Sequence, residues 1–251
     1  MEYTLKKSLG QHFLKDETIC QRIVDAVMQE EPKRLVEVGP GAGAITKYFL
    51  KQPTLDFKAV ELDLEKIGYL EQTYPAIKGK LLHESFLDTA MPFTDRFVVV
   101  GNFPYNISSQ ILFKVLDWKE HVDCVVGMFQ KEVAQRIASK PGNKSYGILS
   151  VLVQAYFEVE YLFDVEPAAF NPPPNVNSGV IKLKPVAAIP EMKSEQKFKL
   201  LVKTAFNQRR KMLRNGVRGM FDPEFLKDEL FNKRAEQLSV EDFAKLTFRM
   251  Q

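Results

Sequence analysis

The chain has 251 residues, of which 45 % are hydrophobic and 27 % charged, and its formal net charge is +3. These values are typical of soluble globular proteins and exclude disordered and fibrous classes. The length suffices for one sizeable domain and a small second one. No apolar run approaches the roughly 18 residues that span a bilayer, and the N-terminus lacks the apolar core of a signal peptide. We therefore expect a cytoplasmic protein without membrane partners.

The cysteines and histidines argue against a metal site. Cys20 and Cys124 lie far apart, and His12, His83 and His121 are scattered along the chain. None of them forms a CxxC pair or the i, i+4 pair of a helical metal site. We expect neither a bound metal nor a disulfide framework.

Short apolar runs alternate with helical patterns over the first two-thirds of the chain. This alternation predicts βαβ units around a mostly parallel sheet. The expected helices, which carry apolar residues at helical spacing, are Asp16 to Gln29 and Ser108 to Leu116. The expected strands are Arg34 to Val38, Phe57 to Leu62, Lys80 to His83, Arg96 to Gly101 and Cys124 to Phe129.

The last third of the chain changes character. A buried helix is predicted over Gly147 to Tyr156, and the strands Val159 to Val165 and Gly179 to Leu183 suit an antiparallel edge. After Pro185 the apolar residues keep helical spacing without strand-like alternation. We predict an α/β domain over residues 1–184, with a Rossmann-like sheet, and a small all-helical domain over residues 185–251.

A glycine-rich loop connects the first predicted strand to a helical stretch. Gly39 and Gly41 fall where the backbone of such a loop approaches a nucleotide cofactor closely. Gly39, Gly41 and Ala44 also satisfy a variant of the dinucleotide fingerprint. The loop by itself therefore leaves a dinucleotide and S-adenosylmethionine both open.

Glu61 ends the next strand, about twenty residues beyond the loop. A carboxylate at this place accepts hydrogen bonds from both hydroxyls of a cofactor ribose. It repels a 2′-phosphate, which excludes NADP, while NAD and S-adenosylmethionine remain possible.

The segment from Gly101 to Asn106, GNFPYN, follows the fourth strand, where open α/β sheets place their ligand crevice. An adenine N6 amine is a poor nucleophile because its lone pair is delocalised into the ring. The side-chain oxygen of Asn102 and the carbonyl of Phe103, restrained by Pro104, are suitable acceptors for the amine hydrogens. Tyr105 can stack on the base. The segment favours amine methylation over hydride transfer.

With these motifs, the sequence resembles the KsgA/RsmA family of ribosomal RNA adenine dimethyltransferases over nearly its whole length. The resemblance implies a class I methyltransferase domain followed by a helical domain. It also implies dimethylation of two adjacent adenosines near the 3′ end of 16S RNA, within an immature small ribosomal subunit. Because nothing in the sequence suggests an interface between copies, we expect a monomer. The matching blocks are KSLGQHFL (7–14), VEVGPGAGAIT (36–46), VELD (60–63), GNFPYNIS (101–108), MFQKEVAQR (128–136), FNPPPNVNS (170–178) and FNQRRKMLRN (206–215).

The resemblance implies roles for individual residues. Tyr105 and Phe170 would sandwich the target adenine, an arrangement used for flipped bases. Asn102 would serve both the cofactor pocket and the target amine. The cofactor-binding residues would be His12, Leu14, Gly39, Gly41, Glu61, Ser85 and Asn102.

Ser85 departs from the family pattern, which has an aspartate that binds the amine of the cofactor adenine. A hydroxyl still accepts a hydrogen bond, although more weakly than a carboxylate. We expect the change to affect cofactor affinity more than reaction type. Asp88, three residues on, is a candidate for compensation.

Basic residues are concentrated between Lys182 and Arg218, with eleven Lys or Arg against two acids. Such a segment suits a polyanion, although a solvated helix face is the common alternative. We predict that Arg209, Arg210, Lys211 and Arg214 contact RNA phosphates, with Lys6, Lys7 and Lys15 as possible additions.

Three other functions compete with this interpretation. A methyltransferase acting on large-subunit RNA does not account for the LGQHFL, FNPPPNVNS and FNQRRKMLRN blocks. A non-catalytic assembly factor, in which Ser85 marks a weakened cofactor site, is disfavoured by the intact glycine loop and Glu61. An NAD-dependent oxidoreductase leaves GNFPYN unexplained.

Overall fold

The computed structural model describes residues 12–251, which divide into two compact units. The first unit contains residues up to 134 together with 160–185, and the second contains 135–159 and 186–251. The final segment of the second unit begins directly after Pro185, where we predicted a domain boundary. The second unit also includes residues 135–159, which lie before that boundary. The assignment of separate functions to residues 1–184 and 185–251 stays a prediction.

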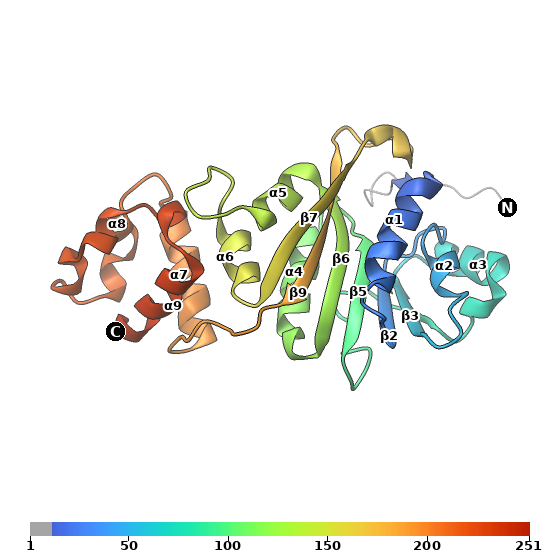
Figure 1. Ribbon diagram of the computed structural model, residues 1–251, viewed down its shortest axis with the longest axis horizontal. Helices are drawn as coiled ribbons and strands as arrows, with labels where there is room; N and C mark the ends of the chain where they lie inside the picture. The colour runs from blue at the N-terminus through green and yellow to red at the C-terminus, as the bar shows by residue number, and fades with distance from the viewer. Residues whose placement is uncertain (1–11) are drawn as a thin grey trace. The chain divides into compact units, whose positions relative to one another are not determined.

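A seven-stranded sheet forms the centre of the first unit, in the order β4-β3-β2-β5-β6-β9-β7 (Figure 1). All pairs among strands β2 to β6 are parallel. Strand β9 pairs with the other side of β6 in antiparallel orientation. The predicted mostly parallel sheet with an antiparallel addition near one edge is confirmed. The strands are β2 (Arg34–Val38), β3 (Asp56–Glu61), β4 (Leu81–His83), β5 (Phe97–Asn102), β6 (Val122–Gln130), β7 (Phe157–Val165) and β9 (Ser178–Pro185).

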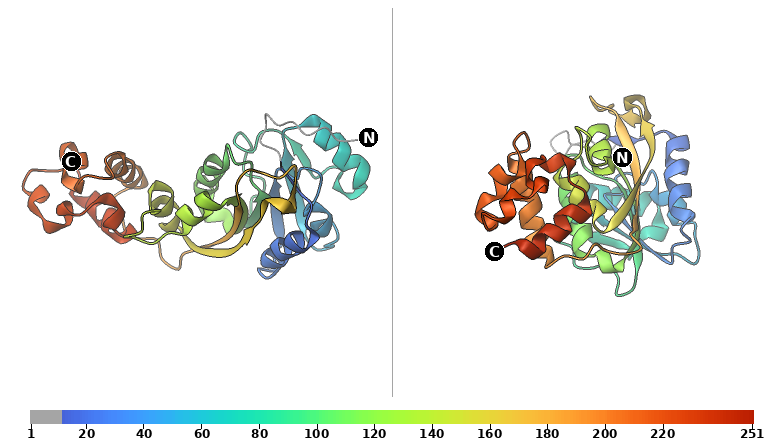
Figure 2. Two further views of the ribbon diagram at one scale, coloured as in Figure 1. Left: turned by 90° about the horizontal axis from the view of Figure 1, so that it is seen from above. Right: turned by 60° about the vertical axis from the view of Figure 1, so that its left-hand side comes forward.

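Helices cover both faces of this sheet. Helix α1 (Glu17–Met28) lies on one face and α4 (Ser108–Asp117) on the other, as Figures 1 and 2 show. Asp16 caps α1 by accepting hydrogen bonds from the backbone of the first turn. The other α-helices of residues 12–138 are α2 (Thr46–Phe49), α3 (Leu64–Thr73) and α5 (Lys131–Ala138).

The central strands are buried because helices cover both of their faces. Val98, Val99 and Val100 of β5 are at most 1 % exposed. Successive side chains of a strand point to opposite faces, and accordingly Val98 and Val100 pack in the same core cluster as Ile23 of α1. This burial fixes the register of the strands and therefore the position of the loops at their ends.

A second, two-stranded sheet joins distant parts of the sequence. Strand β1 (Phe13–Leu14) pairs with β8 (Phe170–Asn171) in antiparallel register, with Leu14 opposite Phe170. Lys15 and Asp16 extend this junction by donating from their backbone to the carbonyl of Ala169. Two-residue strands carry too few residues for an alternating pattern, so we did not predict them.

The second unit is helical, and its core is apolar. Helix α6 (Ile148–Gln154) packs against α7 (Glu195–Asn207) and α9 (Val240–Leu246). Phe198, Leu201 and Val202 of α7 are fully buried, as their helical spacing indicated. Short segments complete the unit: α8 (Leu213–Val217), η5 (Arg218–Met220), η6 (Phe225–Lys227), η7 (Glu229–Asn232), η8 (Ala235–Gln237) and η9 (Thr247–Arg249). Within residues 12–251, no helix has the length and apolar character needed to cross a membrane.

Gly127 gives a direct test of packing under the site. A Cβ added there would lie 2.6 Å from Phe103 and 2.7 Å from Phe129. Both rings are buried and meet edge to face at 5.1 Å, so neither has room to retreat. Because overpacking a core costs about 1–3 kcal/mol, we expect Gly127→Ala to lower the free energy of unfolding by that amount in urea denaturation.

The matched control is Gly68→Ala, in the exposed part of α3, where nothing lies within 4 Å of an added Cβ. Alanine in a helix is favoured over glycine by about 0.5–1 kcal/mol, so this variant should be as stable as the parent or more stable. Equal stability changes in both variants would contradict the packing we describe.

Candidate functional site

A cavity of about 700 Å³ opens at the carboxyl ends of the parallel strands. Its wall is formed by the loops after β2, β3, β4 and β5 and by the chain around β1, so strand pairing brings together segments distant in sequence. The predicted site residues that line it are His12, Leu14, Gly39, Gly41, Glu61, Ser85, Asn102, Phe103, Pro104 and Tyr105. Its volume falls in the range of small-molecule and cofactor sites.

The glycine loop leaves open space where side chains would otherwise stand. Gly39 and Gly41 have φ angles of +65° and +61°, in the region that favours glycine. No atom lies within 4 Å of a Cβ built on Gly39. The backbone N–H of Gly39 donates to the carbonyl of Val60, which holds the loop against β3. The loop therefore offers its backbone directly to a ligand.

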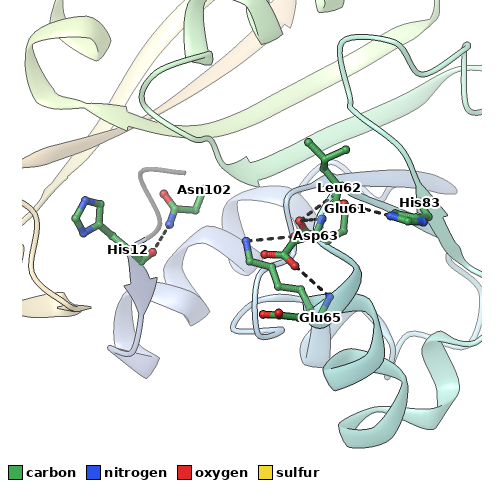
Figure 3. Close-up of polar contacts among 8 residues, drawn as sticks. His12, Glu61, Leu62, Asp63, Glu65, His83 and Asn102 are labelled. Carbon is green, nitrogen blue, oxygen red and sulfur yellow. Dashed lines mark hydrogen bonds and ion pairs between the residues drawn. The ribbon is translucent and has the colours of Figure 1, made fainter. Parts of the chain in front are cut away.

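Glu61 presents one carboxylate oxygen with no hydrogen-bond partner. Its Oε1 accepts from the backbone N–H groups of Leu62 and Asp63, each at 3.0 Å (Figure 3). Its Oε2 is buried without a hydrogen bond, and the Lys66 ammonium lies 3.6 Å away. A buried acceptor without a donor is costly, so this atom fits a ligand hydroxyl. The residues present therefore suit the ribose of a nucleoside cofactor.

Two leucines that we did not assign to the site stand on its rim. Leu62 and Leu64 are 60 % and 66 % exposed, although both are large and apolar, and both line the cavity. His83 contacts the Leu62 carbonyl through its ring Nε2 at 3.2 Å. Exposed apolar side chains beside a buried acid with an open acceptor suit the flat face of a base. The sequence pattern places Leu62 inside the predicted strand, whereas β3 ends at Glu61 and leaves Leu62 on the rim.

Ser85 lies on the cavity wall just beyond β4. Its hydroxyl oxygen accepts from the backbone N–H of Leu87 at 3.2 Å, and its carbonyl accepts from the Thr89 hydroxyl at 3.0 Å. The serine hydroxyl keeps its own hydrogen as a donor. Asp88 is exposed and does not line the cavity, so the structure gives no support to its compensating for Ser85.

Asn102 and its neighbours occupy the other end of the cavity. The side-chain amide nitrogen of Asn102 donates to the carbonyl of His12 at 3.3 Å, so the amide oxygen points away from that bond (Figure 3). The backbone N–H of Phe103 donates to the Met128 carbonyl at 3.1 Å, and its ring is buried. The polar atoms of this segment are thus held by the backbone of His12, the residue before β1, and by the backbone of β6.

Tyr105 is held from two sides. Its hydroxyl shares a 2.6 Å hydrogen bond with Ser178, and its ring is stacked against His12 with centroids 5.7 Å apart. His12 in turn contacts the Pro172 carbonyl through Nδ1 at 2.9 Å. Burial raises the pKa of Tyr105, although its hydrogen bond to Ser178 opposes that shift. The tyrosine is therefore a neutral, oriented ring at the cavity wall.

Phe170 lies next to the site but does not line it. Its side chain is 1 % exposed and packs in the core with Leu14, its partner across the β1–β8 pair. The structure therefore brings Phe170 close to Leu14 and leaves it covered. The sandwich of the target base between Tyr105 and Phe170 stays a prediction.

The predicted RNA-binding residues differ in their surroundings within the second unit. Arg210, Lys211 and Arg214 are exposed. Arg209 is half-buried, pairs with Glu236 at 2.7 Å and also donates to a backbone carbonyl. Arg209 thus has a structural role in its own unit, whereas the other three are open to solvent. Lys6 and Lys7 lie outside the described residues.

The sheet order, the glycine loop and the acid that ends β3 together define a class I methyltransferase domain. The family model for ribosomal RNA adenine dimethylase matches residues 2–251. The chain belongs to this family, and the protein is therefore an enzyme of the ribosomal RNA adenine dimethylase class. The resemblance found in the sequence motifs is confirmed, and so is the Rossmann-like fold.

Curated relatives match over nearly their full length. A ribosomal RNA small subunit methyltransferase A from Cytophaga hutchinsonii is 49 % identical, with 96 % of this chain and 95 % of that protein covered. The protein of the same name from Parabacteroides distasonis is also 49 % identical, with 98 % and 94 % covered.

Solved structures share the fold. A dimethyladenosine transferase from Plasmodium falciparum has a TM-score of 0.78 at 25 % identity, covering 94 % of this chain and 96 % of that one. The 23S rRNA methyltransferase ErmE has a TM-score of 0.74 at 21 % identity, covering 95 % and 99 %. The likeness to ErmE concerns the fold alone. Neither comparison favours an oxidoreductase.

Proposed function

We propose that the protein transfers methyl groups from S-adenosylmethionine to the N6 amines of two adjacent adenosines near the 3′ end of 16S ribosomal RNA. The substrate is the immature small subunit in the cytoplasm, and the protein acts as a monomer. One observation carries the proposal: a single cavity holds both the open acceptor of Glu61 and the segment from Asn102 to Tyr105. The names of the curated relatives support the choice of the small subunit.

The residues that line the cavity indicate how the cofactor would be oriented along the edge of the sheet. The buried Oε2 of Glu61 would accept from the ribose hydroxyls, and the glycine loop would hold the methionine part. Leu62 and Ser85 lie on the side of β4, the end strand of the sheet, and suit the adenine. Asn102 lies on the opposite side, beyond β2, where the reacting end belongs.

The target amine is prepared by acceptors that the chain holds in place. The amide oxygen of Asn102 and the carbonyl of Phe103 accept the two amine hydrogens, which turns the nitrogen lone pair out of the ring. Pro104 restricts the backbone of Phe103, so the carbonyl is oriented before the substrate arrives. Tyr105, fixed by Ser178, supplies a flat surface for the base.

The reaction needs orientation more than acid or base catalysis. The cofactor, when bound, supplies a methyl group activated by its sulfonium charge. Two reacting atoms held in line gain a large effective concentration. The alkylated amine releases its proton to water, so the chain is not required to provide a strong base.

The proposal is tested by transfer of radiolabelled methyl groups to undermethylated small subunits, followed by nucleoside analysis. The parent protein should produce N6,N6-dimethyladenosine. Asn102→Ala should lower kcat about 10²–10³-fold, the usual effect of removing one preorganised polar group from a transition-state site. No methyl incorporation despite tight binding to the subunit would indicate an assembly factor instead of an enzyme.

Two substitutions at Tyr105 serve as matched controls for the role of the ring. Tyr105→Phe loses only the hydrogen bond to Ser178 and should keep most of the activity. Tyr105→Ala loses the stacking surface, which contributes about 1–3 kcal/mol per base, and should lose activity strongly. Equal losses in both variants would assign the hydroxyl, and not the ring, as the important group.

RNA binding by the second unit has its own test. Arg214→Ala should weaken binding to the small subunit and reduce the slope of log K against log salt by about 1, because one phosphate contact is lost. Binding is measured by filter retention at several salt concentrations. Lys245→Ala, an exposed lysine of α9 outside the basic segment, is the control. Identical slopes for both variants would remove Arg214 from the RNA contact.

A further inference from the structure

Glu37 is a buried acid in the wall of the cavity to which neither the motifs nor the proposed chemistry assigned a role. It lies on β2, between Ala59 of β3 and Val100 of β5, and is 1 % exposed. It nevertheless lines the cavity. Carboxyl groups are rarely buried to this extent without a partner of opposite charge.

Glu37 forms no ion pair within residues 12–251, and the Lys66 ammonium, which lines the same cavity, lies 3.6 Å from Glu61 Oε2. Its Oε2 accepts a hydrogen bond from the hydroxyl of Thr46, the first residue of α2, at 2.7 Å. The ionisable group that faces it is another acid, Glu61 on the neighbouring strand, and its β5 neighbour Val100 is uncharged. Burial raises the pKa of Glu37 to about 8, the Thr46 hydroxyl opposes this shift, and the charge of Glu61 adds to it.

We propose that Glu37 balances the charge of the cofactor: it is a neutral acid in the empty cavity, and it ionises when the positively charged methyl donor binds. The O–H bond of the carboxyl group breaks, the proton passes to solvent, and the carboxylate remains beside Thr46. This inference rests on the proposed use of S-adenosylmethionine.

The physical reason is the change in electrostatic surroundings on binding. A cation in a cavity from which water is displaced stabilises a nearby carboxylate far more than it would in bulk water. Ionisation of Glu37 therefore makes the affinity of the protein for its ligand depend on the sulfonium charge. The methyl donor carries this charge and the demethylated product does not. The product lacks the sulfonium charge, so it should induce less proton release and gain less from the coupling.

The sign of the pH dependence follows from the two states. With a pKa of about 8, Glu37 keeps its proton below that pH in the protein without ligand. We expect it to lose that proton when the donor binds. Affinity for the donor should therefore rise as pH increases towards 8, by up to about tenfold per unit, and level off above it. Near pH 7 binding should release almost one proton per site, and at pH 9 almost none.

The test is titration calorimetry of the full chain with S-adenosylmethionine and with S-adenosylhomocysteine, in phosphate and in Tris buffer. The dependence of the observed enthalpy on buffer ionisation enthalpy gives the number of protons released. We expect almost one proton for S-adenosylmethionine at pH 7, fewer for S-adenosylhomocysteine and almost none at pH 9.

Two variants identify the source of the proton. Glu37→Gln keeps an oxygen that can accept from Thr46 but cannot ionise, so the proton release should disappear while binding persists. Thr46→Val removes the hydroxyl that favours the carboxylate and should shift the release to higher pH, which gives a second result if Glu37→Gln fails to fold. Circular dichroism monitors the folding of both variants.

The outcomes separate the inference from the proposed function. Binding of S-adenosylmethionine without proton release, or release that persists unchanged in a folded Glu37→Gln protein, would overturn the role of Glu37 and leave the enzyme assignment intact. No binding of either ligand to the folded parent protein would overturn the proposed cofactor, and the inference with it.

Discussion

The parallel pairing of β2, β3, β4, β5 and β6 is the constraint on which the site depends. Parallel strands place their carboxyl ends at one edge, so the loops that leave β2, β3, β4 and β5 meet there. The burial of these strands on both faces fixes their register, because a slip of one residue would turn apolar side chains to the wrong face. Gly39, Glu61 and Asn102 consequently surround one cavity although they are distant in sequence.

The end of the cavity that contains Asn102 depends on a smaller pairing. The β1–β8 pair joins residues 13–14 to the segment before β9, and hydrogen bonds link His12 to Asn102 and to Pro172. Tyr105 is held between His12 and Ser178. The side chains around the target position thus restrain one another, which is the preorganisation that an orientation-driven reaction requires.

Much of the fold could be predicted because its elements are long and strongly patterned. The buried runs around Val99 and Val125 carry enough apolar residues to identify central strands, and Gly39 and Glu61 carry spacing that points to a nucleoside cofactor. Local pattern was therefore sufficient to predict loops that line the cavity, and the resemblance to a family supplied the class of enzyme.

What the sequence did not indicate depends on contacts between distant residues. The pairing of Leu14 with Phe170 involves only two residues on each strand, and the burial of Phe170 follows from it. Glu37 resembles an ordinary polar position in the pattern VEV. Nothing in that pattern indicates that the hydroxyl of Thr46, on α2, donates a hydrogen bond to its carboxyl group. Leu62 reads as a strand residue, and its exposure on the rim appears only when β3 ends at Glu61.

The orientation of the cofactor is the central claim, because every role assigned to a side chain follows from it. The most direct measurement is a crystal structure of the protein with S-adenosylhomocysteine. We predict that a ribose hydroxyl lies within hydrogen-bonding distance of Glu61 Oε2, with the adenine beside Leu62 and Ser85 and the thioether near Asn102. An adenine bound at Asn102 and Tyr105, with the amino-acid part beside Ser85, would contradict the account.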